Sequence, residues 1–278
     1  MIIDLHTHNS VGSPDSSISP EELITKAKER RVNAICITDH DSYKAVEELK
    51  KIGKKNGILV IRGIELTTKY GHLLIYGTDF YKMFKINKDE LLNVISRKKN
   101  INIEDLKEVF HNFYSPIISN INNSLFKIHE NGGAIVLAHP FGKYGKNTFT
   151  IRYFQEEYLR IHKSKDVKID ELLGFIKEKE PPYYSILQQV DGIEVLNPLC
   201  LSVENRAAIV LANFLDKKQI GSSDCHIIED VGICVTEFPN KIKNEKDFIY
   251  HLRQKDKTIP IFNYNNYCKD RIGFLEPI

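Results

Sequence analysis

The stretch Ile2-Ile3-Asp4-Leu5-His6-Thr7-His8, at residues 2–8, joins an apolar run typical of a buried strand to a histidine pair. Side chains two positions apart on a strand point to the same face, so His6 and His8 can reach one point. Such a pair beside an acidic residue is a common arrangement of metal ligands. On this stretch alone, two ordinary core histidines would be an equally good interpretation.

The same pattern recurs along the chain, where histidines and carboxylates lie at the ends of other apolar runs. They occur at Asp39-His40-Asp41, Glu65, His72, His139 and Asp224-Cys225-His226. In a parallel α/β barrel the carboxyl ends of all strands open on one rim, which is where such barrels hold their active sites. The recurrence therefore favours a shared metal site over unrelated core histidines.

Apolar runs of about four to six residues alternate with helical patterns over most of the chain, as in parallel sheets covered on both faces. The predicted strands are Ile2–Leu5, Ala34–Thr38, Ile58–Arg62, His72–Tyr76, Ala134–Ala138, Gly192–Leu196 and Gln219–Ser223, with a further candidate at Ile261–Tyr264. This alternation predicts an α/β fold, either a barrel or a strongly curved sheet.

Helix starts are marked between these strands. Ser19 precedes Pro-Glu-Glu and predicts a capped helix. Asp41 or Ser42 is expected to cap a helix that ends at Gly57. Further helices are expected to open at Ser202 and at Asn244.

Two polar, helical segments interrupt the alternation, at about residues 79–125 and 143–187. Neither contains an obvious strand. We interpret both as insertions on a single domain that spans residues 1–278, and not as independent domains.

The composition is that of an ordinary soluble protein: 278 residues, 42% hydrophobic, 27% charged and a net charge of +2. This charge gives no reason to expect membrane binding or a stable nucleic-acid complex. No apolar run is long enough for a bilayer span, and the start lacks the features of a signal peptide. Five scattered cysteines are typical of free thiols, so we expect a cytoplasmic protein.

Six histidines combined with carboxylates suit Mn²⁺, Zn²⁺ or Fe²⁺ better than Mg²⁺ or Ca²⁺, which prefer oxygen ligands. This number of ligands exceeds what one ion can bind, so two or three divalent metal ions are expected. Glu65 is the candidate to bridge two of these ions, because it lies near the middle of the strand order. Residual positive charge on such a site would attract phosphate and lower the pKa of bound water.

The chain resembles the PHP (polymerase and histidinol phosphatase) domain family. The matching motifs, in order over residues 1 to about 238, are Asp4-Leu5-His6-Thr7-His8, Ser13-Pro14-Asp15, Ser19-Pro20-Glu21-Glu22-Leu23, Ile37-Thr38-Asp39-His40-Asp41, Gly63-Ile64-Glu65-Leu66, Gly71-His72-Leu73-Leu74, Ala138-His139-Pro140, Gly192-Ile193-Glu194-Val195 and Gly221-Ser222-Ser223-Asp224-Cys225-His226. The resemblance implies a distorted (β/α)7 barrel with helical insertions. It implies as metal ligands His6, His8, Asp15, His40, Glu65, His72, His139, Asp224 and His226.

Other roles are assigned more loosely. Asp39 or His226 is a candidate proton donor to the leaving oxygen, although Asp4 and Asp39 could instead orient imidazoles. Candidate phosphate-binding cations are Lys143, Lys146, Arg152 and Arg206, for which solvated surface charges are the alternative. Glu194 either supports the ligands or covers the barrel end.

The resulting hypothesis is a metal-dependent phosphoesterase, a hydrolase in which hydroxide formed on the ions attacks small phosphate esters at the carboxyl-terminal rim. A nucleotide, a nucleoside bisphosphate and a short RNA are the substrate types expected. The alternatives are a histidinol-phosphate phosphatase, an amidohydrolase-like enzyme acting on C–N or C–O bonds, and a non-catalytic metal-binding module.

Overall fold

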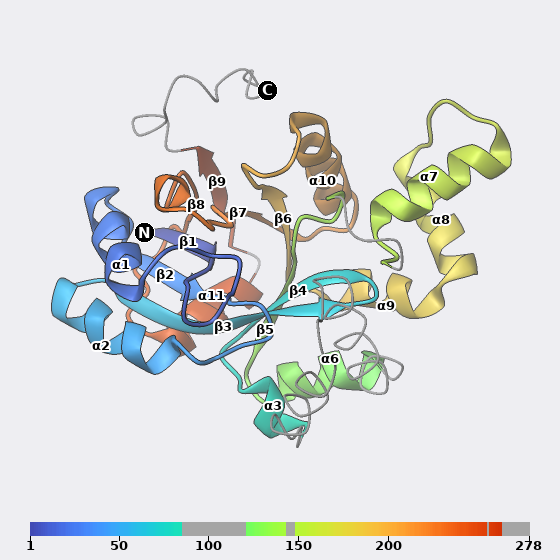
Figure 1. Ribbon diagram of the computed structural model, residues 1–278. Helices are drawn as coiled ribbons and strands as arrows, with labels where there is room; N and C mark the ends of the chain where they lie inside the picture. The colour runs from blue at the N-terminus through green and yellow to red at the C-terminus, as the bar shows by residue number, and fades with distance from the viewer. Residues whose placement is uncertain (85–120, 143–147, 255, 263–278) are drawn as a thin grey trace, which may run out of the picture.

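The computed structural model describes residues 1–84, 121–142, 148–254 and 256–262. Their strands form a nine-stranded sheet in the order β7-β6-β5-β4-β3-β2-β1-β8-β9, with helices packed around it (Figure 1). The strands are β1 (Ile2–Thr7), β2 (Ala34–Ile37), β3 (Leu59–Thr68), β4 (Gly71–Tyr76), β5 (Ala134–Leu137), β6 (Gly192–Leu196), β7 (Lys218–Gly221), β8 (Cys234–Glu237) and β9 (Ile259–Phe262). The helices are α1 (Pro20–Glu29), α2 (Val46–Asn56), α3 (Phe80–Met83), α6 (Ile121–Glu130), α7 (Ile151–His162), α8 (Ile169–Lys179), α9 (Pro181–Gln189), α10 (Ser202–Phe214) and α11 (Glu245–Arg253).

The sheet is mixed, so the prediction of a wholly parallel barrel was wrong. Strands β1–β3 run parallel, as do β5–β7, but β4 is antiparallel to both of its neighbours. The cause is local: Thr68 pairs with Gly71, and the two residues between them can close only an antiparallel hairpin. Gly71 supplies the turn with a φ of 91°, which glycine adopts readily.

The sheet curves until its ends nearly meet, which confirms the α/β barrel-like architecture. On the β7 side, the backbone N–H of Gly221 donates to Thr236 Oγ1 of β8 at 2.9 Å, and that hydroxyl donates to Gly221 O at 2.7 Å. Thr7 forms a parallel bridge with Cys225, just beyond β7. Strand β8 was missed by the sequence prediction, and it is short and antiparallel to β1.

Alternation along β1 separates the core from the site. Ile3 and Leu5 are fully buried in a cluster with Ala34, Cys36 and other apolar residues of the sheet. His6 and the adjoining His8 are equally buried but alternate with these residues. Apolar packing on one side of β1 therefore fixes the strand and directs both imidazoles to the other side.

The predicted helix starts are confirmed at α1, where Ser19 and Glu22 form a capping box, and at α11, where Asn244 caps Asp247 N. Helix α10 begins at Ser202, with Leu201 at the cap position. Helix α2 begins only at Val46, later than predicted. The reason is that Asp41 adopts a φ of 49° and its carboxylate accepts from Thr67 N at 3.1 Å instead of capping the helix.

Both interrupting segments are helical where the structure describes them. Helices α3 and α6 flank residues 85–120, and α7, α8 and α9 follow residues 143–147, which likewise lie outside the described residues. In Figure 1, α7 and α8 stand to one side of the sheet. Leu172 and Tyr183 of the second segment join the buried cluster that contains Ile75 and Leu137 of the sheet. The second segment therefore packs against the sheet, and its interpretation as an insertion stays a prediction.

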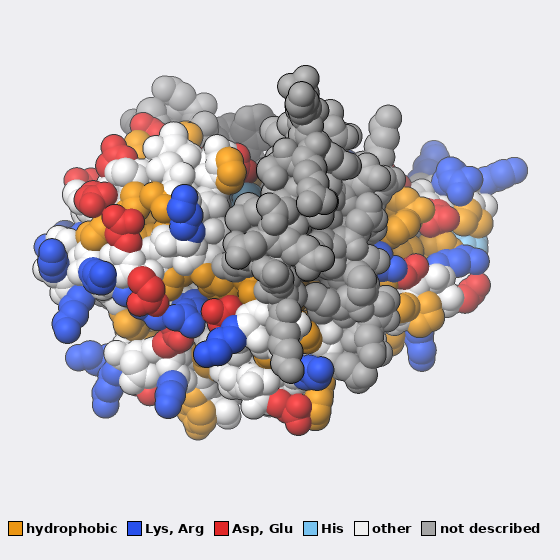
Figure 2. Space-filling model, turned by 60° about the horizontal axis from the view of Figure 1, so that its bottom comes forward, with side chains coloured by type: hydrophobic (Ala, Val, Ile, Leu, Met, Phe, Trp, Pro, Cys, Tyr) orange, Lys and Arg blue, Asp and Glu red, His pale blue; other side chains and the backbone are white. Residues whose placement is uncertain are grey.

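The surface carries mixed charges. On the face in Figure 2, Lys and Arg side chains alternate with Asp and Glu side chains over the left of the view, and apolar atoms lie between them. Across the described ranges, every helix falls short of the length and apolar character that a bilayer crossing requires.

Candidate metal centre

The two histidines of the opening stretch point at two carboxylates from other strands. His6 Nε2 lies 3.2 Å from Glu65 Oε2 and 3.3 Å from Asp224 Oδ1. His8 Nε2 lies 3.3 Å and 3.1 Å from the same two oxygens. Two donor atoms on one tetrahedral ion at roughly 2.0–2.2 Å lie about 3.3–3.6 Å apart, so this spacing suits a shared cation.

Glu65 lies in the middle of the site. It belongs to β3 itself and does not follow the strand, as the sequence had indicated, because β3 continues to Thr68. Its side chain is fully buried, with Oε2 2.9 Å from His40 Nδ1. Its other oxygen, Oε1, lies 2.5 Å from His72 Nδ1 and 3.2 Å from His139 Nε2. The two oxygens of one carboxylate thus face different imidazoles, as a bridging ligand requires.

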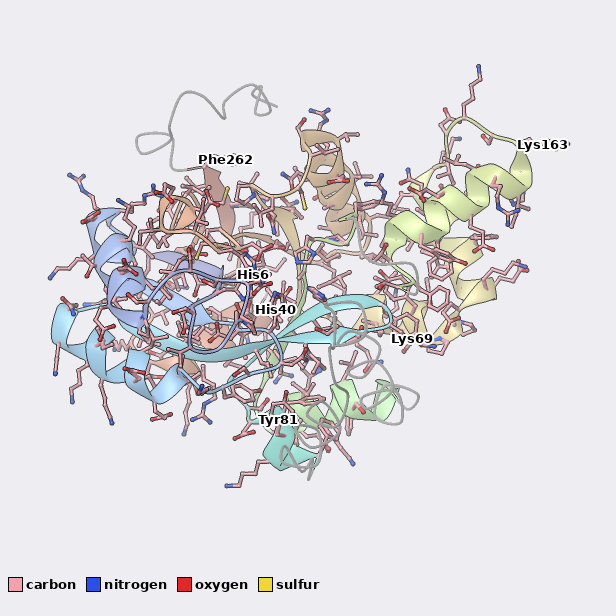
Figure 3. All side chains as sticks on the ribbon, in the orientation of Figure 1. His6, His40, Lys69, Tyr81, Lys163 and Phe262 are labelled. Atoms are coloured by element: carbon pink, nitrogen blue, oxygen red, sulfur yellow. The ribbon has the colours of Figure 1, made fainter. Side chains whose placement is uncertain are left out.

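His72 reaches this rim although its strand runs the opposite way. It is the second residue of β4, and the amino end of an antiparallel strand lies beside the carboxyl ends of its neighbours. The hairpin therefore brings Glu65 and His72 together from two directions. Figure 3 places the labelled His6 and His40 close together at the centre of the molecule, with Lys69 at the hairpin tip.

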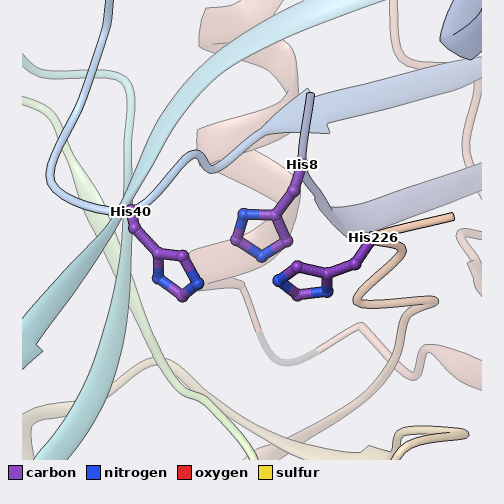
Figure 4. Close-up of side chains that lie close together, drawn as sticks. All are labelled: His8, His40 and His226. Atoms are coloured by element: carbon purple, nitrogen blue, oxygen red, sulfur yellow. The ribbon is translucent and has the colours of Figure 1, made fainter. Parts of the chain in front are cut away.

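A third group of donors lies toward the solvent. The rings of His8, His40 and His226 converge in Figure 4, with centroids 4.5 Å apart for His8–His40 and 4.4 Å for His8–His226. Asp15 Oδ2 lies 3.2 Å from His40 Nε2 and 3.5 Å from His226 Nε2. The Asp15 side chain is 53% exposed, so this is the open edge of the site.

The donor atoms fit bound cations. His6 Nε2 and Glu65 Oε2 are buried, yet neither has a hydrogen-bond partner among the described residues. Burial lowers the pKa of the His6 imidazole, but the charges of Asp224, Glu65 and Glu194 outweigh it and raise that pKa well above its usual value. The carboxylates therefore attract positive charge, and the residues brought together here suit divalent metal ions.

Ser13, which the sequence had offered only as a neighbour of Asp15, orients two of the candidate ligands. Its Oγ lies 3.0 Å from His8 Nδ1, accepts from His40 N at 3.0 Å and donates to Asp39 Oδ1 at 3.0 Å. The hydroxyl donates its one hydrogen bond to Asp39 and uses one lone pair to accept from His40 N. It therefore accepts a hydrogen bond from His8 Nδ1–H with its other lone pair. His8 Nε2 is then left to face the carboxylates.

The contacts of Asp39 are not those expected of a proton donor to a leaving oxygen. It is fully buried and accepts from Asn9 N at 2.9 Å, Asn9 Nδ2 at 2.6 Å and Ser13 Oγ. Its contacts make it a positioning residue that acts through Ser13. Among the described residues Asp4 has backbone partners and no imidazole: its carboxylate accepts from Ser223 N and Gly232 N, both at 3.0 Å.

Gly12 gives a test of this positioning. A Cβ added to Gly12 would lie 2.0 Å from Asp39 Oδ2, so Gly12→Ala must displace the Asp39 carboxylate. We expect the free energy of unfolding to fall by about 1–3 kcal/mol, measured by urea titration. Metal affinity should also fall, because His8 depends on Asp39 through Ser13.

The matched control is Gly174→Ala in α8, where an added Cβ meets nothing within 4 Å. It should stabilise the helix by about 0.5–1 kcal/mol. A Gly12→Ala protein as stable as the wild type would mean that Asp39 moves freely and does not hold this loop.

Two of the four candidate phosphate-binding cations, Arg152 and Arg206, lie among the described residues, and their role stays a prediction. Arg152 is bound to Glu156 at 2.9 Å and to Glu204, which joins α7 to the start of α10. Arg206 is exposed on α10. Lys143 and Lys146 lie outside the described residues.

Asn197 and Ser222 also contact the site, although neither was predicted from the sequence as a site residue. Asn197 Nδ2 donates to Glu194 Oε2 at 3.1 Å and to Asp224 Oδ2 at 3.0 Å, and Ser222 Oγ donates to Glu194 Oε1. Their position after the strand ends of β6 and β7 was the available signal.

Comparison with known proteins places most of the chain in one family. The model of the PHP domain matches residues 4–180, and a model described as PHP-associated matches residues 203–256. A two-domain protein from Bacteroides vulgatus, described as containing a predicted PHP-like metal-dependent phosphoesterase, aligns with 94% of this chain and 64% of its own, at 17% identity and a TM-score of 0.53.

Two curated relatives match only short regions. A PolC-type DNA polymerase III from Oceanobacillus iheyensis is 36% identical over 63 residues, which cover 23% of this chain and 4% of the polymerase. A 5'-3' exoribonuclease from Haemophilus influenzae is 34% identical over 67 residues, 24% of each chain. This chain therefore spans a quarter or less of either relative.

Proposed function

This chain belongs to the PHP-domain family, and on that premise we propose that it is a metal-dependent phosphoesterase acting on small phosphate esters. The observation that carries the proposal is the environment of Glu65. One buried carboxylate faces His40 with one oxygen and His72 and His139 with the other. Such an arrangement would suit two cations held close together, as phosphoester hydrolysis often requires.

The donors divide into three sets that would hold two or three ions, of which Mn²⁺, Zn²⁺ and Fe²⁺ suit imidazole-rich sets best. The first set is His6, His8, Asp224 and Glu65 Oε2; the second is Glu65 Oε1, His72 and His139; the third is Asp15, His40 and His226. Only the third set reaches the exposed edge, through Asp15.

The residues fit hydrolysis at phosphorus. When bound, divalent ions would neutralise phosphate charge and lower the pKa of water toward neutrality. The chain's own carboxylates would hold these ions: Glu65 and Asp224 are buried, and Asp15 is half-exposed. His226 Nδ1 donates to the carbonyl of Asp224 at 2.9 Å, which leaves Nε2 for the third set. While His226 holds an ion, a water molecule would therefore supply the proton to the leaving oxygen.

For the substrate, we propose a nucleotide, a nucleoside bisphosphate or a short oligonucleotide. The similarity to an exoribonuclease over 67 residues supports this class, although it covers only a part of each protein. On the face in Figure 2, Lys and Arg side chains are mixed with Asp and Glu side chains, which favours a small substrate over a long nucleic acid bound along this face.

The test is a substrate panel assayed with Mn²⁺ and with chelator. It should contain nucleoside monophosphates, nucleoside 3',5'-bisphosphates, RNA of about two to five nucleotides, and histidinol phosphate. We expect release of phosphate or nucleotide from a nucleotide-type ester, lost on chelation. The variant His8→Ala should be inactive, because it removes a donor of the first set.

Other outcomes discriminate between the alternatives. Preference for histidinol phosphate would reassign the substrate, and silence on every phosphate ester with metal bound would contradict the proposal. In that case, hydrolysis of C–N or C–O bonds should be assayed next. Full activity of His8→Ala in chelating buffer would exclude metal catalysis.

A further inference from the structure

Glu194, on β6, is buried beside the metal centre, with 1% of its surface exposed. One of its carboxylate oxygens and ring nitrogens of His6 and His139 lie within 4.8 Å of one another. On proximity alone, Glu194 could be an additional ion ligand. Its hydrogen bonds favour a different role.

Hydrogen-bond donors from four residues occupy the lone pairs of the Glu194 carboxylate. Oε1 lies 3.1 Å from His6 Nδ1 and accepts from Ser222 Oγ. Oε2 accepts from the backbone N–H of His139 at 2.8 Å and from Asn197 Nδ2 at 3.1 Å. An ionised carboxylate offers about four lone-pair sites, so none is left for an ion.

The orientation of Asn197 is fixed independently. Its Oδ1 accepts from Leu199 N at 2.8 Å, so the amide nitrogen must face the carboxylates. The second N–H of that nitrogen donates to Asp224 Oδ2 at 3.0 Å. Through Asn197, Glu194 is therefore connected to a third candidate ligand.

Two of the connected ligands have unusual backbone conformations. His139 has a φ of 23° and Asp224 a φ of 49°, both in the region that disfavours residues with a Cβ. The bond from His139 N to Glu194 helps to hold this strained conformation, which aims the imidazole at Glu65.

We propose that Glu194 is a positioning residue of the metal centre and not an ion ligand. Because an ionised carboxylate can only accept, the His6 proton lies on Nδ1, and Nε2 keeps its lone pair facing Glu65 and Asp224. Glu194 thus orients three candidate ligands: His6 on β1, His139 after β5 and, through Asn197, Asp224 after β7. The inference rests on the metal centre proposed above.

Glu194→Gln tests the role at nearly constant volume. If the amide NH₂ group takes the place of Oε2, it faces the donors His139 N and Asn197 Nδ2. If it takes the place of Oε1, it faces Ser222 Oγ and His6 Nδ1, and His6 can avoid the clash only by moving its proton to Nε2, which removes the lone pair that faces the ions. We expect Mn²⁺ affinity, measured by isothermal titration, to fall by about 10–100-fold. The number of ions at saturation should stay as in the wild type.

A second readout follows the proton directly. In Zn²⁺-loaded protein labelled with ¹⁵N-histidine, the wild type should show an exchange-protected Nδ1–H resonance from His6, assigned by its loss in His6→Gln. In Glu194→Gln this resonance should shift and lose protection from exchange, because the amide oxygen is a weaker acceptor than the carboxylate, or disappear if the NH₂ group faces His6. The matched control is Glu245→Gln, which removes a carboxylate bound to Arg62 N at 2.9 Å and should change neither readout.

Each other result is decisive. One ion fewer at saturation in Glu194→Gln would make Glu194 a ligand, and unchanged affinity would give it no part in metal binding. If the variant does not fold by circular dichroism, the wild-type spectrum still decides, since a missing Nδ1–H signal overturns the proposal. A wild-type protein that binds ions but hydrolyses no phosphate ester would overturn the proposed function alone; one that binds no ion would overturn both.

Discussion

Replacing Glu65 with glutamine is expected to lower kcat/KM by roughly 10³-fold or more while leaving the protein folded. The amide keeps one oxygen and replaces the other with an NH₂ group. In one orientation this group faces His72 and His139, and in the other it faces His40. The bridge between two sets of imidazoles is then lost, together with one negative charge. Metal ions contribute several kcal/mol to such reactions, which corresponds to about this factor. Steady-state hydrolysis of the best ester in the panel measures it.

The matched control for Glu65→Gln is Glu180→Gln. Glu180 Oε1 accepts from Tyr70 OH at 2.6 Å and from Lys69 Nζ at 3.0 Å, at the tip of the hairpin that carries Glu65. It tests whether any acid-to-amide change near this hairpin impairs the enzyme. Wild-type activity in Glu65→Gln, or an equal loss in both variants, would contradict the assignment of Glu65 as the bridge.

Adding Mn²⁺ to metal-free protein is expected to raise its stability strongly. Without cations, the buried carboxylates of Glu65, Glu194 and Asp224 lie close enough to repel one another, and the half-exposed Asp15 lies at the edge of the same cluster of histidines. An ion that binds only the folded state adds about 2.7 kcal/mol at 100 times its Kd. In a protein of this size that raises Tm by about 5–10 °C for each ion.

Differential scanning calorimetry after chelation, with and without Mn²⁺, measures this shift. Mg²⁺ should give a smaller shift, because imidazole-rich sets suit it poorly. The variant Glu65→Gln should lose much of the Mn²⁺ effect. A Tm that does not respond to any divalent cation would contradict the metal centre, whatever the activity measurements show.

Much of the site could be predicted from sequence because its donors lie at strand ends. The alternation in residues 2–8 places His6 and His8 on one face, which is a local property of a strand. Asp224 and His226 follow β7, and the left-handed φ of 49° at Asp224 means that strand alternation does not explain their orientation. Their position after a strand end was nevertheless visible in the sequence, and the structure brings all four side chains together.

The remainder depended on contacts between distant residues. A two-residue turn before Gly71 converts the predicted parallel barrel into a mixed sheet, yet it also carries His72 to the correct rim. The roles of Ser13 and Asn197 arise from bonds across 26 and 27 residues, to Asp39 and Asp224, which no periodicity reveals. The ion pair of Arg152 with Glu204, 52 residues further along the chain, is likewise a contact that no local pattern predicts.

The proposed role of Glu65 is to bridge ions held by the histidines around it. A crystal structure grown with Mn²⁺ and phosphate, with data collected for anomalous scattering, tests this role. We expect two or three Mn²⁺ peaks, one contacting Glu65 Oε2 with His6 and His8, and another contacting Glu65 Oε1 with His72 and His139. The absence of any peak at Glu65, or a peak coordinated by Glu194 in its place, would contradict it.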